Sequence, residues 1–376
     1  MINNKKKVLH MLSSLNAGGA ETNLLALMAH FDSDVYEHAV AYGGENGALE
    51  PEFRSAGIKL IQLSPVPLGV GAFFKYKDIL SRIKQFSPDI IHSHLDLTNV
   101  FGLLAKKSFG SHLVIHFHGL GMIPHKLLPN RPFKHRLWNV IARSYKKCDK
   151  AIAICTFQIP FLLDLGFKKE QIDLIPNGIN FDSDEPISVP AHEGYKFVNV
   201  GRFQPQKDHR MLVDAFKGVV KKVPSAKLIL VGDGQLRSSI EEQVLSLGLE
   251  NSVEFLGVRR DIPEILANSD CFVLGSRWEL HPITILEAMR TGLPVIASDV
   301  GGISDTVDDG NTGLLIEAEN TSSLESAMIE LALDVERGKN MGANGLKRVK
   351  KHFNNAIVAQ QIEQVYRDVL SDSRAS

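Results

Sequence analysis

Two glutamates, Glu279 and Glu287, stand eight positions apart in the segment ELHPITILE. Two carboxylates can flank one bond and act on it as acid and base, as in glycoside hydrolysis. On one continuous helix, however, residues eight apart lie about 12 Å apart along the axis, which is too far to share a bond. Pro282 favours another arrangement, because proline is preferred at the first helical position. We therefore expect Glu279 in a loop and Glu287 on the second turn of a helix.

The start of this helix predicts an anion-binding site. The N–H groups of a first helical turn have no partner within the helix and attract negative charge, and here they belong to Ile283, Thr284 and the next residue. Two cations, Arg202 and Lys207, follow the apolar run KFVNV and could meet the same ligand. Taken alone, each of these residues also fits an ordinary solvent-exposed position.

Four histidines occur in two alternating pairs, His92 with His94 and His116 with His118. Because alternate residues of a strand point to one side, each pair faces one side of its strand. If the two strands are neighbours, the four imidazoles form a cluster. Such a cluster can hold zinc, and buried histidines with ordinary hydrogen bonds are the alternative. No carboxylate or cysteine partner is evident, so we expect no metal.

Short apolar, β-branched runs alternate with helical patterns along the chain. Strands are expected at 8–12, 38–42, 59–63, 89–94, 112–118, 151–155 and 172–176, and again at 196–201, 227–232, 253–257, 271–275, 294–298 and 313–317. Three helical patterns follow at 321–333, 336–351 and 354–370. This alternation predicts an α/β protein with parallel sheets that helices cover on both faces.

The two series of strands predict two Rossmann-like, doubly wound domains that face a cleft. The first domain covers residues 1–180 and the second residues 195–350. The polar segment 181–194 contains two prolines and is the expected linker. Residues 351–376 are expected to form a helix that packs back on the first domain. Ligands of such sheets bind at the carboxyl ends of the strands, so the site is expected in the cleft.

Composition agrees with a two-domain globular protein. The chain has 376 residues, of which 44% are hydrophobic, and no apolar run approaches the ~18 residues of a membrane span. Its three cysteines, Cys148, Cys155 and Cys271, are too few and too far apart for a disulfide framework and fit a reducing cytoplasm.

Positive charge is concentrated in the first part of the chain. Residues 1–150 contain 19 basic and 11 acidic residues, and the stretch 126–150 alone has eight basic residues and one acid, Asp149. A helix there would place Arg136, Arg143, Lys147 and Lys150 on one side and apolar residues on another. Such a helix can lie on an anionic membrane surface, or it can simply pack its apolar side on the sheet. A nucleic-acid partner is not expected, because no aromatic binding surface accompanies the charges.

Several motifs together resemble the retaining glycosyltransferases of family 4, which have the GT-B fold. The most specific is S-x2-E-x7-E-A-M-x2-G-x-P-V-I-A, followed by Gly301-Gly302. The stretches NAGGAE, HFHG, VGRFQPQKD and FLGVRRD occur in the order that the family shows, and the resemblance covers about residues 5–350. Leu280-His281 departs from it, since the family usually has glycine after the first glutamate, and Asp305 stands where the family often has glutamate.

The resemblance implies a role for each site residue. Glu279 would contact the donor sugar and Glu287 the ribose, while Pro282, Ile283 and Thr284 would meet the diphosphate. Further contacts with the donor or the reacting sugar are implied for residues from other motifs, namely Gly18, Gly19, His118, Arg202, Lys207 and Arg259.

No metal or other cofactor is implied, because Arg202 and Lys207 would stabilise the departing diphosphate. Two Asp-x-Asp triplets, of the kind that holds a metal in many glycosyltransferases, occur at 32–34 and 182–184. Both lie in polar loops that are not placed like a metal site.

The implied activity is retaining transfer of a hexosyl or N-acetylhexosaminyl group from a nucleotide-diphosphate sugar, expected to be a UDP-sugar. The acceptor would be a hydroxyl of a glycan or lipid-linked molecule in the synthesis of cell-envelope polysaccharide, lipopolysaccharide or glycolipid. The first domain would bind the acceptor and the second the donor. The expected location is the cytoplasm, with peripheral contact to the inner face of the membrane. A non-hydrolysing nucleotide-sugar epimerase and a non-catalytic, membrane-associated scaffold are the alternatives.

Overall fold

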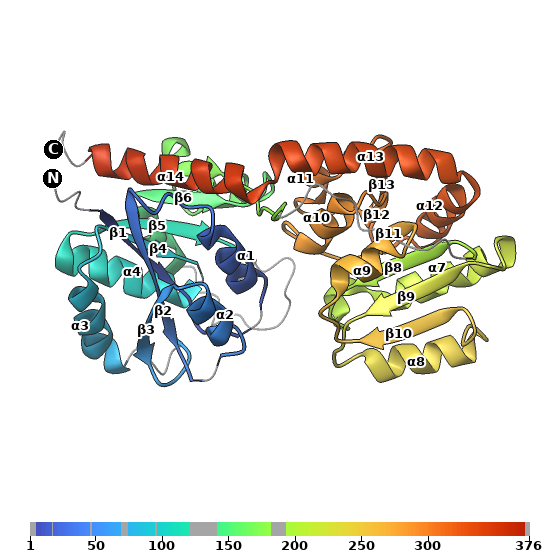
Figure 1. The fold of residues 1–376 in the computed structure, drawn as a ribbon, viewed down its shortest axis with the longest axis horizontal. Coiled ribbons are helices and arrows are strands. Elements are labelled where there is room, and N and C mark those ends of the chain that lie inside the picture. The colour runs from blue at the N-terminus through green and yellow to red at the C-terminus, as the bar shows by residue number, and fades with distance from the viewer. Residues whose placement is uncertain are drawn as a thin grey trace. The chain divides into compact units, whose positions relative to one another are not determined.

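The chain consists of two compact units. The computed structural model describes residues 5–16, 18–45, 47–68, 74–94, 96–119, 141–181 and 193–372. Unit 1 comprises Met1–Asn180 and Asn355–Ser376, and unit 2 comprises Phe181–Asn354 (Figure 1). Unit 1 is therefore built from both ends of the chain.

Unit 1 contains a parallel sheet of seven strands in the order β3-β2-β1-β4-β5-β6-β7. The strands are β1 (Lys6–Met11), β2 (Tyr36–Gly43), β3 (Lys59–Ser64), β4 (Ile90–Ser93), β5 (His112–Phe117), β6 (Lys150–Ala153) and β7 (Ile172–Leu174). The helices are α1 (Gly19–Met28), α2 (Glu50–Ser55), α3 (Tyr76–Phe86), α4 (Asp96–Phe109), α6 (Gln158–Asp164) and α14 (Asn355–Asp372), with 3-10 turns at Tyr145–Lys147 and Lys169–Gln171. The strand order reverses between β1 and β4, as in doubly wound sheets.

Unit 2 contains a parallel sheet of six strands in the order β10-β9-β8-β11-β12-β13. The strands are β8 (Lys196–Val200), β9 (Lys227–Val231), β10 (Val253–Gly257), β11 (Cys271–Leu274), β12 (Val295–Ser298) and β13 (Gly313–Ile316). The helices are α7 (His209–Lys222), α8 (Arg237–Ser246), α9 (Ile262–Ala267), α10 (Ile283–Arg290), α11 (Ile303–Thr306), α12 (Thr321–Leu333) and α13 (Val335–His352), and a 3-10 turn spans Pro205–Lys207. Each strand predicted from the sequence is present, and the predicted α/β class with parallel sheets is confirmed.

Helices cover both faces of the sheet in unit 1. Along β4, Ile91 packs in an apolar layer with residues of α3 and α4, whereas Ile90 packs in a second layer with residues of α1 and α14. Successive residues of a strand face opposite sides, so a strand buried on both sides must be apolar almost throughout. This requirement explains why the strands stand out as continuous apolar runs in the sequence.

The last helix, α14, packs on the sheet of unit 1, where it lies beside α1 (Figure 1). Its buried side chains recur at helical spacing and include Val358, Ile362, Val365 and Val369. Tyr366, on the same side, shares a buried hydrogen bond of 2.6 Å with Nδ1 of His92 in β4. The helix thus contributes both apolar contacts and a polar contact to the core of unit 1.

Two further expectations concern disulfides and membrane-spanning helices. The three cysteines are buried, and no disulfide joins any two of them. Over the residues that the structure describes, we find no helix with the length and apolar character needed to cross a membrane.

The packing of α14 predicts a clear contrast between two neighbouring substitutions. Ile362 is 1% exposed, so Ile362→Ala should lower the free energy of unfolding by about 2–5 kcal/mol through lost burial and a new cavity. Gln361 is exposed, so Gln361→Ala should change it by less than about 0.5 kcal/mol. Urea unfolding followed by circular dichroism measures both. Equal effects of the two variants would contradict the packing of α14 on the sheet.

Candidate active site

Residues of the family motifs in unit 2 follow neighbouring strands of its sheet. Lys207 lies in the segment after β8, Glu279 in the segment after β11, and Gly301 in the segment after β12. Because parallel strands end at one edge of a sheet, these segments converge there. The sequence placed these residues far apart, and the strand order β8-β11-β12 brings them together.

Lys207 and Glu279 form a largely buried ion pair. Nζ of Lys207 lies 2.5 Å from Oε1 of Glu279, and the two side chains are 15% and 8% exposed. The hydroxyl of Ser276 donates a second hydrogen bond, of 2.9 Å, to the same oxygen. The stem of Lys207 passes over Gly201, where a Cβ atom would lie 3.5 Å from three of its carbons. Two donors on one oxygen fix the orientation of the Glu279 carboxylate.

The segments that carry this pair are also joined to each other. The amide N–H of Arg277 donates to the carbonyl of Gln206 at 2.8 Å, and the Gln206 side chain donates to the carbonyl of Trp278 at 2.9 Å. Nε of Arg277 donates to Oδ2 of Asp208 at 2.7 Å. Asp208 adopts the left-handed conformation, with φ of 44°, and its side chain caps α7. Sequence analysis did not select Arg277 or Asp208, because their interaction joins residues that are distant in the chain.

Gly301 allows the backbone of Glu279 to approach closely. Its φ is +61°, and a Cβ atom there would lie 1.7 Å from the carbonyl oxygen of Glu279. A side chain at position 301 would therefore push the Glu279 segment out of place.

Leu280 and His281, which depart from the family motif, are buried beside Gly301 and α11. They are 6% and 4% exposed, and Nε2 of His281 lies 3.1 Å from the hydroxyl of Thr306. Burial lowers the pKa of His281 to about 4, so the imidazole is neutral at pH 7. Both side chains support the shape of the Glu279 segment from inside the domain.

Helix α10 begins one residue later than predicted. Pro282 has extended backbone angles, with φ of −70° and ψ of 120°, and is the N-cap, whereas Ile283 is the first helical residue. A proline at the cap still leaves the N–H groups of Ile283 and Thr284 without helical partners. The buried hydroxyl oxygen of Thr284 also lacks a hydrogen-bond partner among the described residues. The start of α10 therefore offers several unused polar groups.

Glu287 lies on the second turn of α10, as predicted, and is partly buried. Burial raises the pKa of its carboxyl group, and the nearby Arg290 guanidinium opposes this shift. A carboxyl group in such a place can accept hydrogen bonds from ligand hydroxyls without competition from much water.

The two predicted arginines of unit 2, Arg202 and Arg259, differ in their ion pairs. Arg202 is exposed and forms no side-chain ion pair with a described residue. Arg259 follows the edge strand β10, is exposed, and pairs with Asp261. The structure thus joins Lys207 directly to Glu279 and leaves Arg202 and Arg259 outside that pair.

The histidines of unit 1 form a continuous row. Strands β4 and β5 are neighbours, so the four predicted histidines do cluster, and His10 of β1 and His38 of β2 extend the row. Ring nitrogens lie 2.9 Å apart between His38 and His10, 3.1 Å between His10 and His94, and 3.0 Å between His94 and His118. Sequence analysis missed His10, which is paired with His92 in the register of β1 and β4.

Burial keeps the histidine row neutral. It lowers the pKa of His118 to about 3 and that of His38 to about 4, and it depresses the pKa values of the other members as well, namely His10, His92, His94 and His116. His118 directly follows β5 and is only partly buried, so it ends the row at the carboxyl edge of the sheet.

The glycine loop of unit 1 precedes α1. Gly18 is the N-cap of that helix and Gly19 its first residue. A Cβ atom on Gly18 would lie 2.5 Å from Oε2 of Glu21, whereas the space around Gly19 is open. Glu21 is 7% exposed, and burial raises the pKa of its carboxyl group. Sequence analysis included Glu21 in the motif NAGGAE but assigned it no role.

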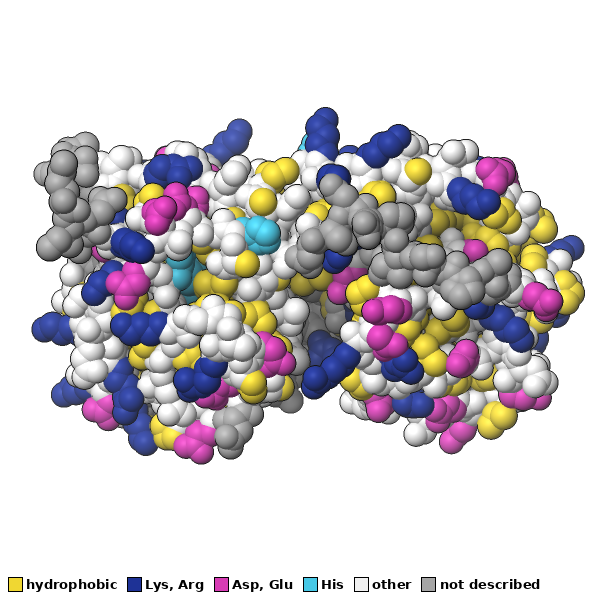
Figure 2. Space-filling view, viewed as in Figure 1, with side chains coloured by type: hydrophobic (Ala, Val, Ile, Leu, Met, Phe, Trp, Pro, Cys, Tyr) yellow, Lys and Arg dark blue, Asp and Glu magenta, His cyan; other side chains and the backbone are white. Residues whose placement is uncertain are grey.

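Other predicted features lie only partly within the described residues. Asp32 accepts a hydrogen bond of 2.9 Å from the amide of Asp34, which is a local turn contact. The second Asp-x-Asp triplet, the linker from 182 to 192 and the basic stretch up to residue 140 lie outside the described residues. In the described part of that stretch, Lys150 begins β6, so the prediction that it shares one helix with Arg143 and Lys147 is wrong. On the face drawn in Figure 2, basic and acidic side chains are interspersed over both units.

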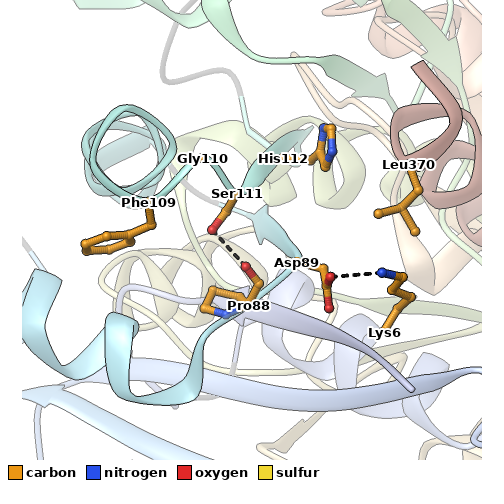
Figure 3. Close-up of a pocket in the computed structure, with 8 residues that line it drawn as sticks. All are labelled: Lys6, Pro88, Asp89, Phe109, Gly110, Ser111, His112 and Leu370. Atoms are coloured by element: carbon orange, nitrogen blue, oxygen red, sulfur yellow. Dashed lines mark hydrogen bonds and ion pairs between the residues drawn. The ribbon is translucent and has the colours of Figure 1, made fainter. Parts of the chain in front are cut away.

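A pocket of about 320 Å³ lies at the opposite edge of the unit 1 sheet (Figure 3). Lys6, Asp89 and His112 line it, at the amino ends of β1, β4 and β5. The Lys6 ammonium pairs with Asp89 at 3.2 Å, and Ser111 donates to the carbonyl of Pro88 at 2.8 Å. Lys6 and Ser111 thus have partners within the pocket, and the pocket contains none of the predicted site residues.

Comparison with known proteins relates both halves of the chain to one class of enzyme. The model described as Glycosyltransferase Family 4 matches residues 17–183, and the model described as Glycosyl transferases group 1 matches residues 180–348. The N-acetyl-alpha-D-glucosaminyl L-malate synthase of Bacillus anthracis is 36% identical over 297 residues, which are 76% of this chain and 76% of that protein. The UDP-Gal:alpha-D-GlcNAc-diphosphoundecaprenol alpha-1,3-galactosyltransferase of Escherichia coli is 28% identical, and the match covers 77% of each chain.

Solved structures share the fold. The crystal structure of Anabaena HepE in complex with UDP-glucose has a TM-score of 0.80 at 24% identity, and the match covers 96% of this chain and 99% of that chain. The structure of the same protein with UDP has a TM-score of 0.82 at 22% identity.

The low pKa of His281 predicts a specific dependence of stability on pH. An unfolded histidine takes up a proton near pH 6.5, whereas the folded His281 resists protonation down to about pH 4. Its contribution to stability is therefore complete above pH 6.5 and is lost as the pH falls toward 4, at up to about 1.4 kcal/mol per pH unit. His281→Gln should remove this part of the pH dependence.

Trp278 fluorescence in a Trp138→Phe background reports the urea unfolding of unit 2, because the chain has only two tryptophans. The plot of unfolding free energy against pH should be shallower for His281→Gln between pH 6.5 and 5. Parallel plots for the two proteins would contradict the neutral, buried state of His281.

Proposed function

The chain belongs to family 4 of the glycosyltransferases, which have the GT-B fold, and from this premise we propose that it transfers a sugar from a UDP-sugar to a hydroxyl of a glycan or lipid-linked acceptor. We also propose that the transfer retains the anomeric configuration and needs no metal. The observation that supports this proposal most directly is the Lys207–Glu279 pair, held at the strand ends next to the free start of α10.

Lys207 and Arg202 are proposed to stabilise the leaving group. As the glycosidic bond breaks, negative charge develops on the diphosphate, and fixed cations aimed at it stabilise the transition state more than the ground state. Lys207 is already oriented by Glu279, so little reorganisation is needed when the donor binds. Arg202 is exposed and free to approach the same phosphates.

Glu279 is proposed to hold the donor sugar. Its carboxylate is oriented by Lys207 and Ser276 and can accept hydrogen bonds from sugar hydroxyls. The diphosphate would then meet the N–H groups of Ile283 and Thr284 and the unused hydroxyl of Thr284. Glu287, one turn further along α10, would accept hydrogen bonds from the ribose. In this arrangement the two glutamates bind two parts of one donor and do not act as an acid and base.

We further propose that the acceptor loses its proton without the help of a protein base. The departing phosphate oxygen takes the proton of the acceptor hydroxyl, so no protein base is required. His118 is neutral at pH 7 and can hydrogen-bond the reacting sugar without adding charge. Gly18 and Gly19 let the backbone at the start of α1 approach a ligand in unit 1.

UDP is the proposed nucleotide because relatives and structural neighbours point to it. The E. coli relative is named for a UDP-galactose donor, and HepE was crystallised with UDP and with UDP-glucose. Arg259 is proposed as an additional donor contact, although in the structure it pairs with Asp261.

The proposed acceptor is a lipid-linked glycan at the inner face of the membrane. The E. coli relative is named for a diphosphoundecaprenol acceptor. The basic stretch 126–150 would face anionic lipid, and its described part contains Arg143 and Lys147. An epimerase would need no acceptor, and a scaffold would need no oriented Lys207–Glu279 pair, which is why transfer is the better-supported function.

A thermal-shift comparison tests the nucleotide. A ligand that binds only the folded protein stabilises it by about 2.7 kcal/mol at 100 times its dissociation constant. UDP should therefore raise the melting temperature, whereas GDP and ADP at the same concentration should not. Glu287→Gln should reduce the effect of UDP, because a neutral amide oxygen accepts hydrogen bonds from the ribose less strongly than a carboxylate does. A larger shift with GDP or ADP would overturn the choice of nucleotide.

Turnover of a panel of UDP-sugars, followed as UDP release with a glycan acceptor, tests the catalytic assignments. Lys207→Ala and Glu279→Gln should each lower kcat by about 100-fold to 1000-fold, the range for loss of one preorganised group. Lys217→Ala, an exposed lysine of α7, is the matched control and should retain full activity. Normal turnover by Lys207→Ala or Glu279→Gln would refute the site.

EDTA added to the same assay tests the role of the cations. Activity should persist in its presence, because Lys207 and Arg202 take the place of a metal. A complete loss of activity that Mg²⁺ restores would contradict this part of the proposal.

A further inference from the structure

The histidine row contains more imidazoles than the proposed transfer uses. Only His118, at the carboxyl edge of the sheet, has a role in it. His94 and His116 lie beside His118, with ring centroids 5.2 Å and 3.9 Å from its ring. One ring nitrogen from each of these three residues lies within 4.8 Å of the other two.

His116 has unused polar groups in the interior of the protein. Its side chain is 2% exposed, and both ring nitrogens lack a hydrogen-bond partner among the described residues. A buried polar atom without a partner is costly, and in a native protein it often marks a ligand that is not seen. The unused nitrogens belong to the residue that stands next to both His94 and His118.

The spacing of one pair of ring nitrogens in this group is close to that of metal ligands. Two nitrogens bound to one tetrahedral zinc ion at 2.0–2.1 Å lie about 3.3 Å apart. Nδ1 of His94 and Nε2 of His118 already lie 3.0 Å apart. A ring nitrogen of His116 lies within 4.8 Å of one nitrogen of each of the other two rings. We therefore propose that His94, His116 and His118 form a binding site for a transition-metal ion of the zinc type.

The donor set indicates which ions fit. Three imidazoles without a carboxylate favour zinc, copper, nickel or cobalt over magnesium and calcium, which prefer oxygen ligands. His118 is the partly exposed member, so the ion enters from its side and keeps a fourth position for water.

A second group of three, His10, His92 and His94, is less suited to this role. Nδ1 of His92 is occupied by Tyr366, and Nε2 of His10 by His38. All three are at most 2% exposed, so this inner group has no open side. His94 belongs to both groups. Because a neutral imidazole has only one nitrogen with a free lone pair, His94 can bind an ion in only one of the two groups at a time.

Occupation of the site has a consequence that rests on the proposed function. An ion on His118 removes the imidazole from the reacting sugar, so the metal acts as an inhibitor. The proposed transfer needs no metal. Removal of the ion by a chelator would therefore leave His118 available to contact the reacting sugar. The site would make the enzyme sensitive to free zinc through a residue of unit 1.

Isothermal titration of the full chain with Zn²⁺, in metal-free buffer without substrates, tests the site directly. The wild type should bind one ion per chain with clearly higher affinity than any further ions. His116→Phe keeps an aromatic ring in the core but has no ligand atom, and it should lose this tight binding. His352→Ala, a histidine of unit 2, is the control and should bind as the wild type does. Equal binding by wild type and His116→Phe, or no binding by the wild type, would overturn the proposal.

A second measurement tests the same site without His116→Phe, in case that variant does not fold. Co²⁺ added to the wild type should give the visible absorption of a tetrahedral site, and Zn²⁺ should abolish it. Loss of the absorption in His94→Gln, whose circular dichroism is expected to match the wild type, supports the same site. An octahedral Co²⁺ spectrum in the wild type would count against it.

The inhibitory consequence is tested by UDP release. Zn²⁺ should inhibit the wild type, EDTA should restore its activity, and His116→Phe should be at least ten times less sensitive. If the wild type binds Zn²⁺ but has no transferase activity, the metal site stands and the proposed function fails. If it is active and binds no Zn²⁺, the metal site fails alone.

Discussion

The ion pair between Lys207 and Glu279 is the interaction on which the donor site depends. It joins the segments after β8 and β11, and the contacts of Arg277 with Gln206 and Asp208 join the same segments a second time. Loops that follow a sheet are ordinarily its most mobile parts, and here two of them are fixed to each other. A charged group whose position is already fixed loses little conformational entropy when a ligand binds.

The sequence predicted the elements well, for a physical reason. Strands buried on both faces must be apolar almost throughout, so they appear as short, mostly apolar and β-branched runs. Glu279 and Glu287 could be assigned to a loop and a helix because Pro282 separates them. The error of one residue at Pro282 is of the kind expected at helix ends, where the boundary is defined only to within one or two residues.

Interactions between distant segments could not be predicted in the same way. The partner of Asp208 is Arg277, and that of His92 is Tyr366, which is 274 positions away. Such pairs depend on strand order and on the return of α14 to unit 1, neither of which leaves a periodic signal. The histidine row was partly predictable, since alternate positions on strands face one side, but its extension to His10 required the register of β1 and β4.

The departure at Leu280-His281 can now be interpreted from its surroundings. Glycine at this place in a motif usually gives the backbone room, and here the room is supplied by Gly301, whose missing Cβ admits the carbonyl of Glu279. Leu280 and His281 point into the domain, where His281 meets Thr306 of α11. Because both side chains are buried, little of either is exposed for contact with a donor. Any influence on the choice of sugar must pass through the backbone that positions Glu279, and α11 is then as important to that choice as the loop itself.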